Sequence, residues 1–242
     1  MRYSPAPMLD ISRIKAITLD LDDTLWPIWP TIELAELRLQ EWLQEQAPLT
    51  SALFTSPHAR VALREQAQNG WPDQHHNLSF MRREMIRLGL QQSGEDQNLA
   101  GPAFGVFFDA RQQVTLFEDV APALARLSAR WSVLALSNGN ADVHRVGIGQ
   151  YFCGSVSARE VGVGKPDVRI FQAAAQSLQL DAGEILHVGD DESLDVLGAL
   201  DAGMQTAWVN RSDKLWSYSA QPHTTVASMT VLCDVLGAVA VA

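Results

Sequence analysis

The sequence predicts an α/β fold, in which a doubly wound, Rossmann-like parallel sheet carries an inserted all-helical cap domain. Two observations lead to this prediction. Short apolar runs closed by Gly, Asn or Asp alternate with helical patterns along the chain, as they do in parallel sheets that are covered on both faces. Between the first run and the second, residues 27–113 show helical periods separated by breakers and no buried-strand run.

Four apolar runs are predicted as strands, and the first three end in polar residues. The strands are 14–19 (ending at Asp20), 133–136 (ending at Ser137, Asn138 and Gly139), 185–188 (ending at Gly189, Asp190 and Asp191) and 204–209. Helical patterns lie at 142–146, 168–178 and 192–202, the second just after Pro166, which suits a helix start. A loop at 214–222 and a closing helix through Leu236 complete this part.

The inserted stretch is predicted to be a separate helical domain. Helices are expected at 31–46, capped by Thr31, at 56–70, at 78–88, followed by Gly89, and at 95–112. We therefore expect an α/β core domain formed by residues 1–26 and 114–242, and a helical cap domain formed by residues 27–113. A helical insertion of this kind is expected to act as a lid over a site in the core.

Composition excludes several classes of function. The chain has 242 residues and a formal net charge of -10, and its lysines are Lys15, Lys165 and Lys214 alone. So acidic a protein repels nucleic-acid backbones and anionic lipid, so neither is expected as a partner. Cys153 and Cys233 match no metal-ligand spacing and are predicted to be buried, reduced and hydrophobic in role. Without a signal sequence or a membrane-spanning run, a cytoplasmic location is expected.

Carboxylates follow the first and third predicted strands. Asp20 comes directly after the first strand and Asp22 two residues later, while Asp190 follows the third strand. Ligands of open α/β sheets bind beyond the carboxyl ends of the strands, so these side chains are expected in one crevice. One carboxylate of the Asp20–Asp22 pair can attack phosphorus while the other protonates the departing oxygen. Asp190 is suited to coordinate a hard cation through oxygen.

Phosphate-binding groups are expected beside these carboxylates. Ser137 and Asn138 can donate hydrogen bonds to phosphate oxygens from a strand-to-helix turn, and Lys165 lies in a Gly-rich loop. Each piece also has a plainer explanation, as a turn, a solvated loop or, for Asp190 and Asp191, a helix cap. Their joint occurrence at strand ends within one βα series favours a phosphate site. A divalent cation with Lys165 would offset the repulsion between carboxylates and phosphate.

These motifs resemble those of the haloacid dehalogenase superfamily of phosphohydrolases with a helical C1-type cap. The hhhhDxDxT signature is matched at residues 17–24, the second motif at Ser137, the third at Lys165, and the GDxxxxD motif at Gly189, Asp190 and Asp195. The resemblance implies that Asp20 is a nucleophile forming an aspartyl-phosphate and that Asp22 is the general acid. It implies Mg²⁺ bound by Asp20, the Asp22 backbone carbonyl and Asp190. Thr24, Asp191 and Asp195 would lie just outside these groups, with no clear role for Asp191.

Within that superfamily, the amino-acid sequences of several segments are similar to those of a bacterial branch of phosphatases. These segments are residues 19–26, 137–141 and 184–191. The branch acts on flavin mononucleotide and on 5-amino-6-(5-phosphoribitylamino)uracil, so a small phosphorylated metabolite is expected as substrate. Trp26 follows the Asp20 loop closely and is a candidate surface for stacking a flat ring, although a core role is equally open. Trp42 and Trp71 are expected in the core of the cap.

Other activities stay open or are disfavoured on particular residues. A sugar-phosphate mutase shares all four motifs, and a phosphate-binding module without catalysis is a further alternative. Family dehalogenases usually lack the second Asp, so Asp22 argues for phosphoryl transfer. Phosphonate hydrolysis in the family needs a cap lysine, and residues 27–118 contain none. The oligomeric state is not indicated by the sequence.

Overall fold

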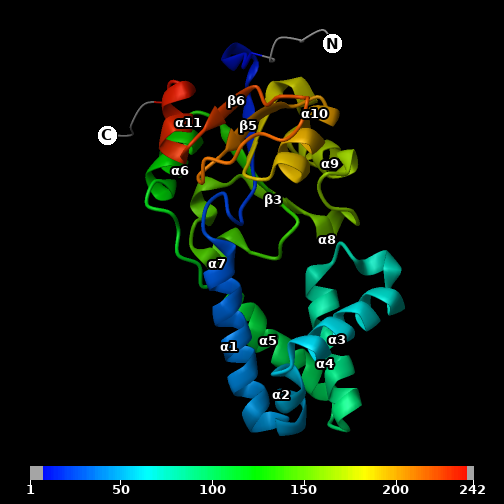
Figure 1. The fold of residues 1–242 in the computed structure, drawn as a ribbon. Coiled ribbons are helices and arrows are strands. Elements are labelled where there is room, and N and C mark those ends of the chain that lie inside the picture. The colour runs from blue at the N-terminus through cyan, green and yellow to red at the C-terminus, as the bar shows by residue number, and fades with distance from the viewer. Residues whose placement is uncertain (1–7, 239–242) are drawn as a thin grey trace. The chain divides into compact units, whose positions relative to one another are not determined.

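The computed structural model describes residues 8–238 (Figure 1). Its contacts divide the chain into two compact units. The first comprises the chain up to Pro27 and from Leu116 onward, and the second is Ile28–Thr115. The first unit is an α/β structure and the second contains helices only. No helix of the described residues is long and apolar enough to span a membrane.

The first unit is built on one sheet of six parallel strands in the order β3-β2-β1-β4-β5-β6. This confirms the predicted doubly wound parallel sheet. The chain places β1 in the middle, adds β2 and β3 on one side, and then returns to add β4 on the other, so the winding reverses between β1 and β4. The strands are β1 (Ala16–Leu19), β2 (Ser132–Ser137), β3 (Gly154–Ser157), β4 (Ile185–Gly189), β5 (Gln205–Val209) and β6 (Thr224–Val226).

Helices cover this sheet on opposite sides, α6 and α11 on one and α9 and α10 on the other (Figure 1). Against the second side, Leu134 and Leu136 of β2 pack with Ile170 and Phe171 of α9. Burial on both faces explains why the inner strands read as continuous apolar runs. The helices are α6 (Val120–Ser128), α7 (Val143–Val146), α8 (Ala158–Val161), α9 (Val168–Leu178), α10 (Gly198–Asp201), preceded by a π-helical turn at Glu192–Leu197, and α11 (Met229–Val235).

Two strands, β3 and β6, and two helices, α6 and the short α8, were not predicted from the sequence. β3 and β6 are the edge strands, and most of their residues are only partly buried, so neither needs an apolar run. The helix α6 was also missed, although it buries Val120, Ala123, Leu124 and Leu127 at helical spacing. Cys233 is buried as predicted, but the prediction for Cys153 is wrong, because this residue is exposed beside the edge strand β3.

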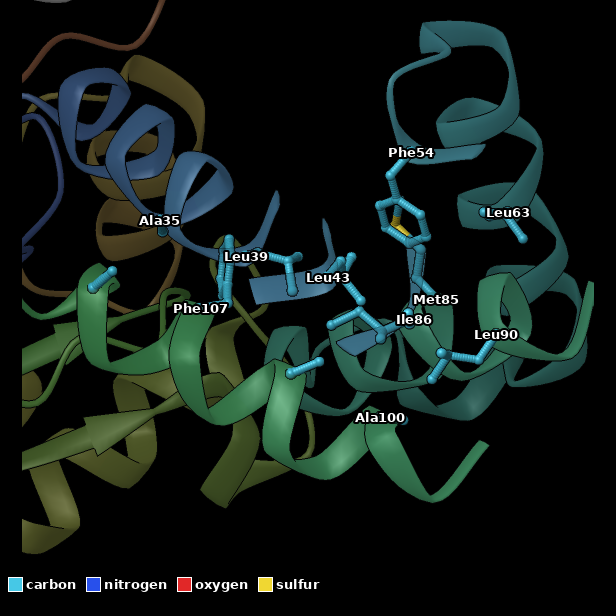
Figure 2. Close-up of a cluster of buried hydrophobic side chains, with 13 residues drawn as sticks. Ala35, Leu39, Leu43, Phe54, Leu63, Met85, Ile86, Leu90, Ala100 and Phe107 are labelled. Atoms are coloured by element: carbon cyan, nitrogen blue, oxygen red, sulfur yellow. The ribbon is translucent and has the colours of Figure 1, made fainter. Parts of the chain in front are cut away.

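The second unit contains five α-helices around a core of its own (Figure 2). One stripe of α1 supplies Ala35, Leu39 and Leu43, which recur every four residues and face the other helices. Leu63, Met85, Leu90 and Phe107 complete the cluster from α3, α4 and α5. The helices are α1 (Ile28–Gln46), α2 (Pro48–Phe54), α3 (Pro57–Gly70), α4 (Leu78–Ser93) and α5 (Ala100–Arg111).

Several predicted details of this unit are wrong. The helix α1 begins at Ile28, so Thr31 lies inside it and does not cap it. The additional helix α2 was not predicted, and α5 begins at Ala100 after a short 3-10 turn. The helix α4 continues through Gly89 to Ser93 and ends at Gly94, whose φ of 72° is left-handed. Gly89 avoids a steric clash, because a Cβ at this position would lie 2.4 Å from Cε2 of Phe54. Trp42 packs against the core as predicted, but Trp71 is 47% exposed.

Two of the helical glycines of this unit, Gly89 and Gly105, predict opposite effects of one substitution. Gly105→Ala in α5 places a methyl group where nothing lies within 4 Å, so it is expected to raise the free energy of unfolding by roughly 0.5–1 kcal/mol. Gly89→Ala forces Phe54 to move inside a packed core and is expected to lower it by about 1–3 kcal/mol. Urea unfolding of both variants measures the difference. Equal stabilisation by both substitutions would contradict the packing described for Gly89.

Candidate active site

Asp20 stands at the carboxyl end of the central strand, where the winding of the sheet reverses. β1 ends at Leu19, and the backbone N–H of Asp20 still donates to the carbonyl of Val188 on β4 at 2.9 Å. The side chain of Asp20 therefore leaves the sheet beside the end of β4, as expected for a ligand site in an open sheet. It is buried, with 7% of the residue exposed. Burial, with Asp195 and Asp190 nearby, raises the pKa of Asp20, although Lys165 opposes this.

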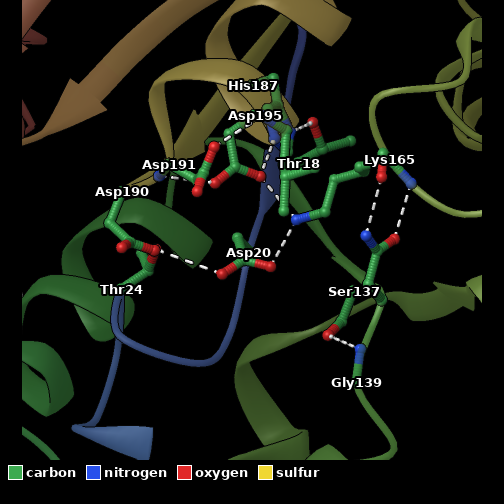
Figure 3. Close-up of polar contacts among 12 residues, drawn as sticks. Thr18, Asp20, Thr24, Ser137, Gly139, Lys165, His187, Asp190, Asp191 and Asp195 are labelled. Carbon is green, nitrogen blue, oxygen red and sulfur yellow. Dashed lines mark hydrogen bonds and ion pairs between the residues drawn. The ribbon is translucent and has the colours of Figure 1, made fainter. Parts of the chain in front are cut away.

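A buried lysine joins two of the carboxylates. Nζ of Lys165 donates to Oδ1 of Asp20 and, at 2.6 Å, to Oδ1 of Asp195 (Figure 3). Burial alone would lower the pKa of Lys165, but the charges of Asp195 and Asp20 outweigh it and raise this pKa. Lys165 is thus charged at every physiological pH, and it holds a positive charge against the side chain of Asp20.

Asp195 is held in turn by a polar chain inside the sheet domain. Besides Lys165, it accepts from Nε2 of His187 at 3.1 Å and from the backbone N–H of Asp191 at 3.0 Å. Burial would raise the pKa of Asp195, but Lys165 and His187 hold it below its ordinary value. An ionised Asp195 needs a donor at Nε2, so Nδ1 of His187 accepts from the hydroxyl of Thr18 at 2.8 Å.

Thr18 and His187 were missed by the sequence analysis. They face each other across the β1–β4 register and lie within runs that were counted as apolar strands. A signal was present, since a threonine and a histidine inside two neighbouring buried strands each need a hydrogen-bond partner. Burial lowers the pKa of His187, which keeps the ring neutral.

Thr24 links the carboxylates of the two central strands. Its hydroxyl lies 3.1 Å from Oδ1 of Asp190 and 3.4 Å from Oδ2 of Asp20 (Figure 3). Among the described residues, no hydrogen bond joins Asp190 to Lys165. Burial, followed by the charges of Asp195 and Asp23, raises the pKa of Asp190 to about 7. The structure thus brings Asp20, Thr24, Lys165, Asp190 and Asp195 together.

Of the two predicted phosphate-binding residues on the second strand, Asn138 has different contacts from those expected. Its amide nitrogen donates to the carbonyl of Lys165 at 2.9 Å, and its oxygen accepts from the backbone N–H of Lys165 at 2.6 Å. Both groups are therefore engaged in fixing the lysine loop rather than turned to a ligand. Ser137 is buried and its oxygen accepts from the N–H of Gly139 at 2.9 Å. Its hydroxyl proton can still be donated to a phosphate oxygen.

Asp22 and Trp26 form a pair of their own. The indole Nε1 of Trp26 donates to Oδ1 of Asp22 at 2.8 Å, and the same two residues form an isolated β-bridge. Trp26 has no exposed surface, so the suggestion that it stacks on a ligand is wrong in this structure. The Asp22 carboxylate does not belong to the cluster formed by Asp20, Asp190 and Asp195. The indole instead fixes its direction.

Asp191 caps the turn that follows the third predicted strand. Its Oδ1 accepts from the backbone N–H groups of Ser193 at 2.8 Å and Leu194 at 2.7 Å. This is the plainer of the two explanations considered for the double Asp. Because the Asp191 N–H also donates to Asp195, the cap fixes the backbone from which Asp190 projects.

The carboxylates of this site fit a divalent cation. Asp20, Asp190 and Asp195 offer oxygens that all lie within 4.8 Å of one another, and Lys165 contacts two of them, Asp20 and Asp195. Three carboxylates with one ammonium leave an excess of negative charge, and oxygen donors suit Mg²⁺. Both oxygens of Asp195 already accept hydrogen bonds. Asp20 and Asp190 are therefore the residues that would hold the ion.

Comparison with known proteins gives a consistent family. A family model described as haloacid dehalogenase-like hydrolase matches residues 14–203. The chain is 29% identical over 234 residues to the 5-amino-6-(5-phospho-D-ribitylamino)uracil phosphatase YigB of Escherichia coli K12, which covers 93% of this chain and 98% of that protein. It is 31% identical over 182 residues to the (S)-2-haloacid dehalogenase of Pseudomonas sp. strain YL, which covers 68% of this chain and 78% of that one.

A solved structure is similar over nearly the whole chain. The 2-haloacid dehalogenase from Pseudomonas syringae pv. Tomato DC3000 is 36% identical and has a TM-score of 0.88, covering 93% of this chain and 98% of that one.

The raised pKa of Asp190 predicts how pH and metal act on stability. Its folded pKa of about 7 lies above the ordinary value of 3.8, so the stability it contributes is present below pH 4 and is lost as the pH rises to 7. A cation at Asp190 offsets this loss, but at pH 5 only about one carboxyl in a hundred is ionised to receive it. Added Mg²⁺ is therefore expected to raise Tm at pH 8 and to have little effect at pH 5, as measured by calorimetry.

The neighbouring carboxylate supplies the control for this experiment. Asp190→Asn is expected to abolish the Mg²⁺-dependent rise in Tm. Asp191→Asn removes the same charge one residue away and keeps a good capping side chain, so it is expected to retain the rise. A rise of equal size at both pH values, or in both variants, would place the cation elsewhere.

Proposed function

The chain belongs to the haloacid dehalogenase-like hydrolase family, and we propose that it is a magnesium-dependent phosphatase that hydrolyses a small phosphate monoester. The observation that carries the proposal is the contact between Asp20 and the buried Lys165 at the reversal point of the sheet, with a second carboxylate, Asp22, two residues away. A nucleophile, a fixed positive charge and a proton donor are the groups that phosphoryl transfer requires.

In the first step a carboxylate oxygen of Asp20 attacks phosphorus. The bond between phosphorus and the leaving oxygen breaks, and Asp22 gives its proton to that oxygen, so the product leaves as an alcohol. Lys165 and the hydroxyl of Ser137 are suited to bind the phosphoryl oxygens, where negative charge accumulates. The result is an aspartyl-phosphate on Asp20.

In the second step water replaces the aspartyl group. Asp22, now a carboxylate, accepts a proton from water, and the water oxygen attacks phosphorus. The Asp20 carboxylate and inorganic phosphate are released. The hydrogen bond that Trp26 donates to Asp22 is stronger when the carboxyl is ionised, which is the form required to accept this proton. Mg²⁺, when bound by Asp20 and Asp190, would supply electrostatic stabilisation of the phosphoryl group.

Dehalogenation is the second candidate, because two of the relatives are named as 2-haloacid dehalogenases. The chemistry of this site favours phosphate transfer over it. A halide leaves as a stable anion and needs neither a proton from Asp22 nor a cation. In contrast, an alkoxide needs the proton, and a phosphate dianion beside three carboxylates needs the cation.

For the substrate we propose flavin mononucleotide or the ribityl phosphate of a riboflavin precursor. The proposal is supported by likeness to the ribitylaminouracil phosphatase over nearly the full length of both chains. The proposal also agrees with the sequences of the segments 19–26, 137–141 and 184–191, which resemble those of the bacterial phosphatase branch.

Activity assays with two classes of substrate test the proposal. With Mg²⁺ the protein is expected to release phosphate from flavin mononucleotide and 4-nitrophenyl phosphate, and to lose this activity in excess chelator. Asp20→Asn is expected to abolish it, because an amide cannot attack phosphorus. Release of halide from 2-chloropropionate, with no phosphate release from either ester, would decide for dehalogenation. Turnover of sugar phosphates alone would refute the flavin-related substrate.

The indole of Trp26 predicts a dependence on the leaving group. Trp26→Phe keeps a buried ring but removes the hydrogen bond that orients Asp22. For an alkyl phosphate, kcat/KM is expected to fall at least about tenfold, since a hydrogen bond to a charged group contributes roughly 1.5–3 kcal/mol. For 4-nitrophenyl phosphate it is expected to change about twofold or less, because nitrophenolate leaves without a proton.

Trp131→Phe is the matched control for this variant. It also removes a buried indole donor, which bonds to the carbonyl of Ile14 at 3.1 Å. It is expected to lower Tm without changing the ratio of kcat/KM for the two substrates. If Trp26→Phe reduced both values equally, the indole would not act through Asp22.

A further inference from the structure

The helical unit contains a pocket of its own, and none of the residues that line it belongs to the carboxylate cluster of Asp20, Asp190 and Asp195. It has a volume of about 470 Å³ and is lined by residues of α1, α3 and α4, all of which belong to Ile28–Thr115. Ile32 and Met85 give it apolar surface, and Trp29, Arg60 and Arg64 line it as well. No role in the proposed reaction has been given to any of these side chains.

Two arginines of the pocket lack counterions. Arg60 and Arg64 are four residues apart on α3, so their side chains share one face of the helix. In the part of the chain that the structure describes, neither guanidinium forms an ion pair or a side-chain hydrogen bond. Arg82, on the same pocket, differs: it pairs with Glu36 at 2.7 Å and lies over the ring of Phe107. Arg60 and Arg64 are therefore available to a ligand.

An exposed indole lines the same pocket. Trp29 is 71% exposed, whereas Trp26, three residues earlier, is fully buried. A large aromatic side chain left in water beside guanidinium groups can bind a flat ring by stacking. Arginine binds carboxylate and phosphate through two parallel hydrogen bonds. The pocket thus offers separate groups for a ring and for an anion.

The charge of the pocket stands out against that of the whole chain. Three arginines and two glutamates line it, and the ion pair of Arg82 with Glu36 cancels one of each. The exposed Glu33 offsets one further arginine and leaves a net positive charge. Because the chain carries a net charge of -10, a positive pocket is a local exception that attracts anions.

We propose that this pocket binds a planar organic anion, with its carboxylate or phosphate on Arg60 and Arg64 and its ring on Trp29. The proposal goes beyond the phosphatase reaction and does not depend on it, because it uses none of the residues around Asp20.

Calorimetric titration of the full chain with 2-naphthoate tests the proposal. The buffer contains no divalent cation, so the acidic cluster around Asp20 repels the probe. Arg60→Gln/Arg64→Gln is expected to raise the Kd at least about tenfold through loss of two charge-assisted hydrogen bonds. Trp29→Ala is expected to raise it as well, and Glu33→Gln to lower it. Cyclohexanecarboxylate, which has the charge without the flat ring, is expected to bind more weakly than 2-naphthoate.

A second pair of arginines controls for the loss of charge. Arg38 and Arg83 are exposed in the same unit and do not line the pocket. Arg38→Gln/Arg83→Gln is expected to leave the Kd within about twofold of the parent. Equal Kd values for the two double variants would overturn the proposal. In an Asp20→Asn background, 2-naphthyl phosphate tested in the same way decides whether the pocket prefers phosphate or carboxylate.

Discussion

The site depends on one buried ammonium group placed between two carboxylates. Lys165 contacts Asp20 and Asp195, and a charge in that position is tolerable only because it is paired on both sides. Its loop is fixed by the amide of Asn138 on both backbone groups of Lys165. Gly164 permits this approach, since a Cβ there would lie 2.7 Å from Oδ1 of Asn138. The position of Asp20 at the end of β1 therefore depends on a loop that lies between α8 and α9.

The same arrangement explains why polar residues occur inside the sheet. Asp195 must stay ionised to hold Lys165, and it also accepts hydrogen bonds from the backbone N–H of Asp191 and from His187, which is held by Thr18. The chain of contacts thus runs from the interior of β1 and β4 through Asp195 and Lys165 to the carboxylate of Asp20. Asp190 is different, because burial raises its pKa and it shares only the hydroxyl of Thr24 with Asp20. The carboxylate without an ammonium partner is the one that most needs a cation.

The sequence predicted the elements and residues that follow a strong pattern, such as apolar strands and motif carboxylates. It did not predict features that depend on contacts with other parts of the chain. The inner strands β1, β2, β4 and β5 are apolar runs because both faces are buried, whereas the edge strands β3 and β6 carry no such signal. Asp20, Lys165, Asp190 and Asp195 were expected together from motif spacing, and the structure brings them together. The spacing of residues in the sequence does not indicate which way an amide or an indole side chain points. The contacts of Asn138 and Trp26 could therefore be found only in the structure.

The strand order has a consequence for synthesis on the ribosome. β1 is made early, but the strands that pair with it, β2 and β4, come after the helical unit in the chain. The strands on both sides of Asp20 are therefore made only after residues 130 and 185. The helical unit is one continuous segment, Ile28–Thr115, with a core of its own, so it can form while β1 is still unpaired. In the nascent chain Asp20 therefore lies in a segment without its partners, and the carboxylate cluster can form only after Asp190 and Asp195, which follow β4, have been made.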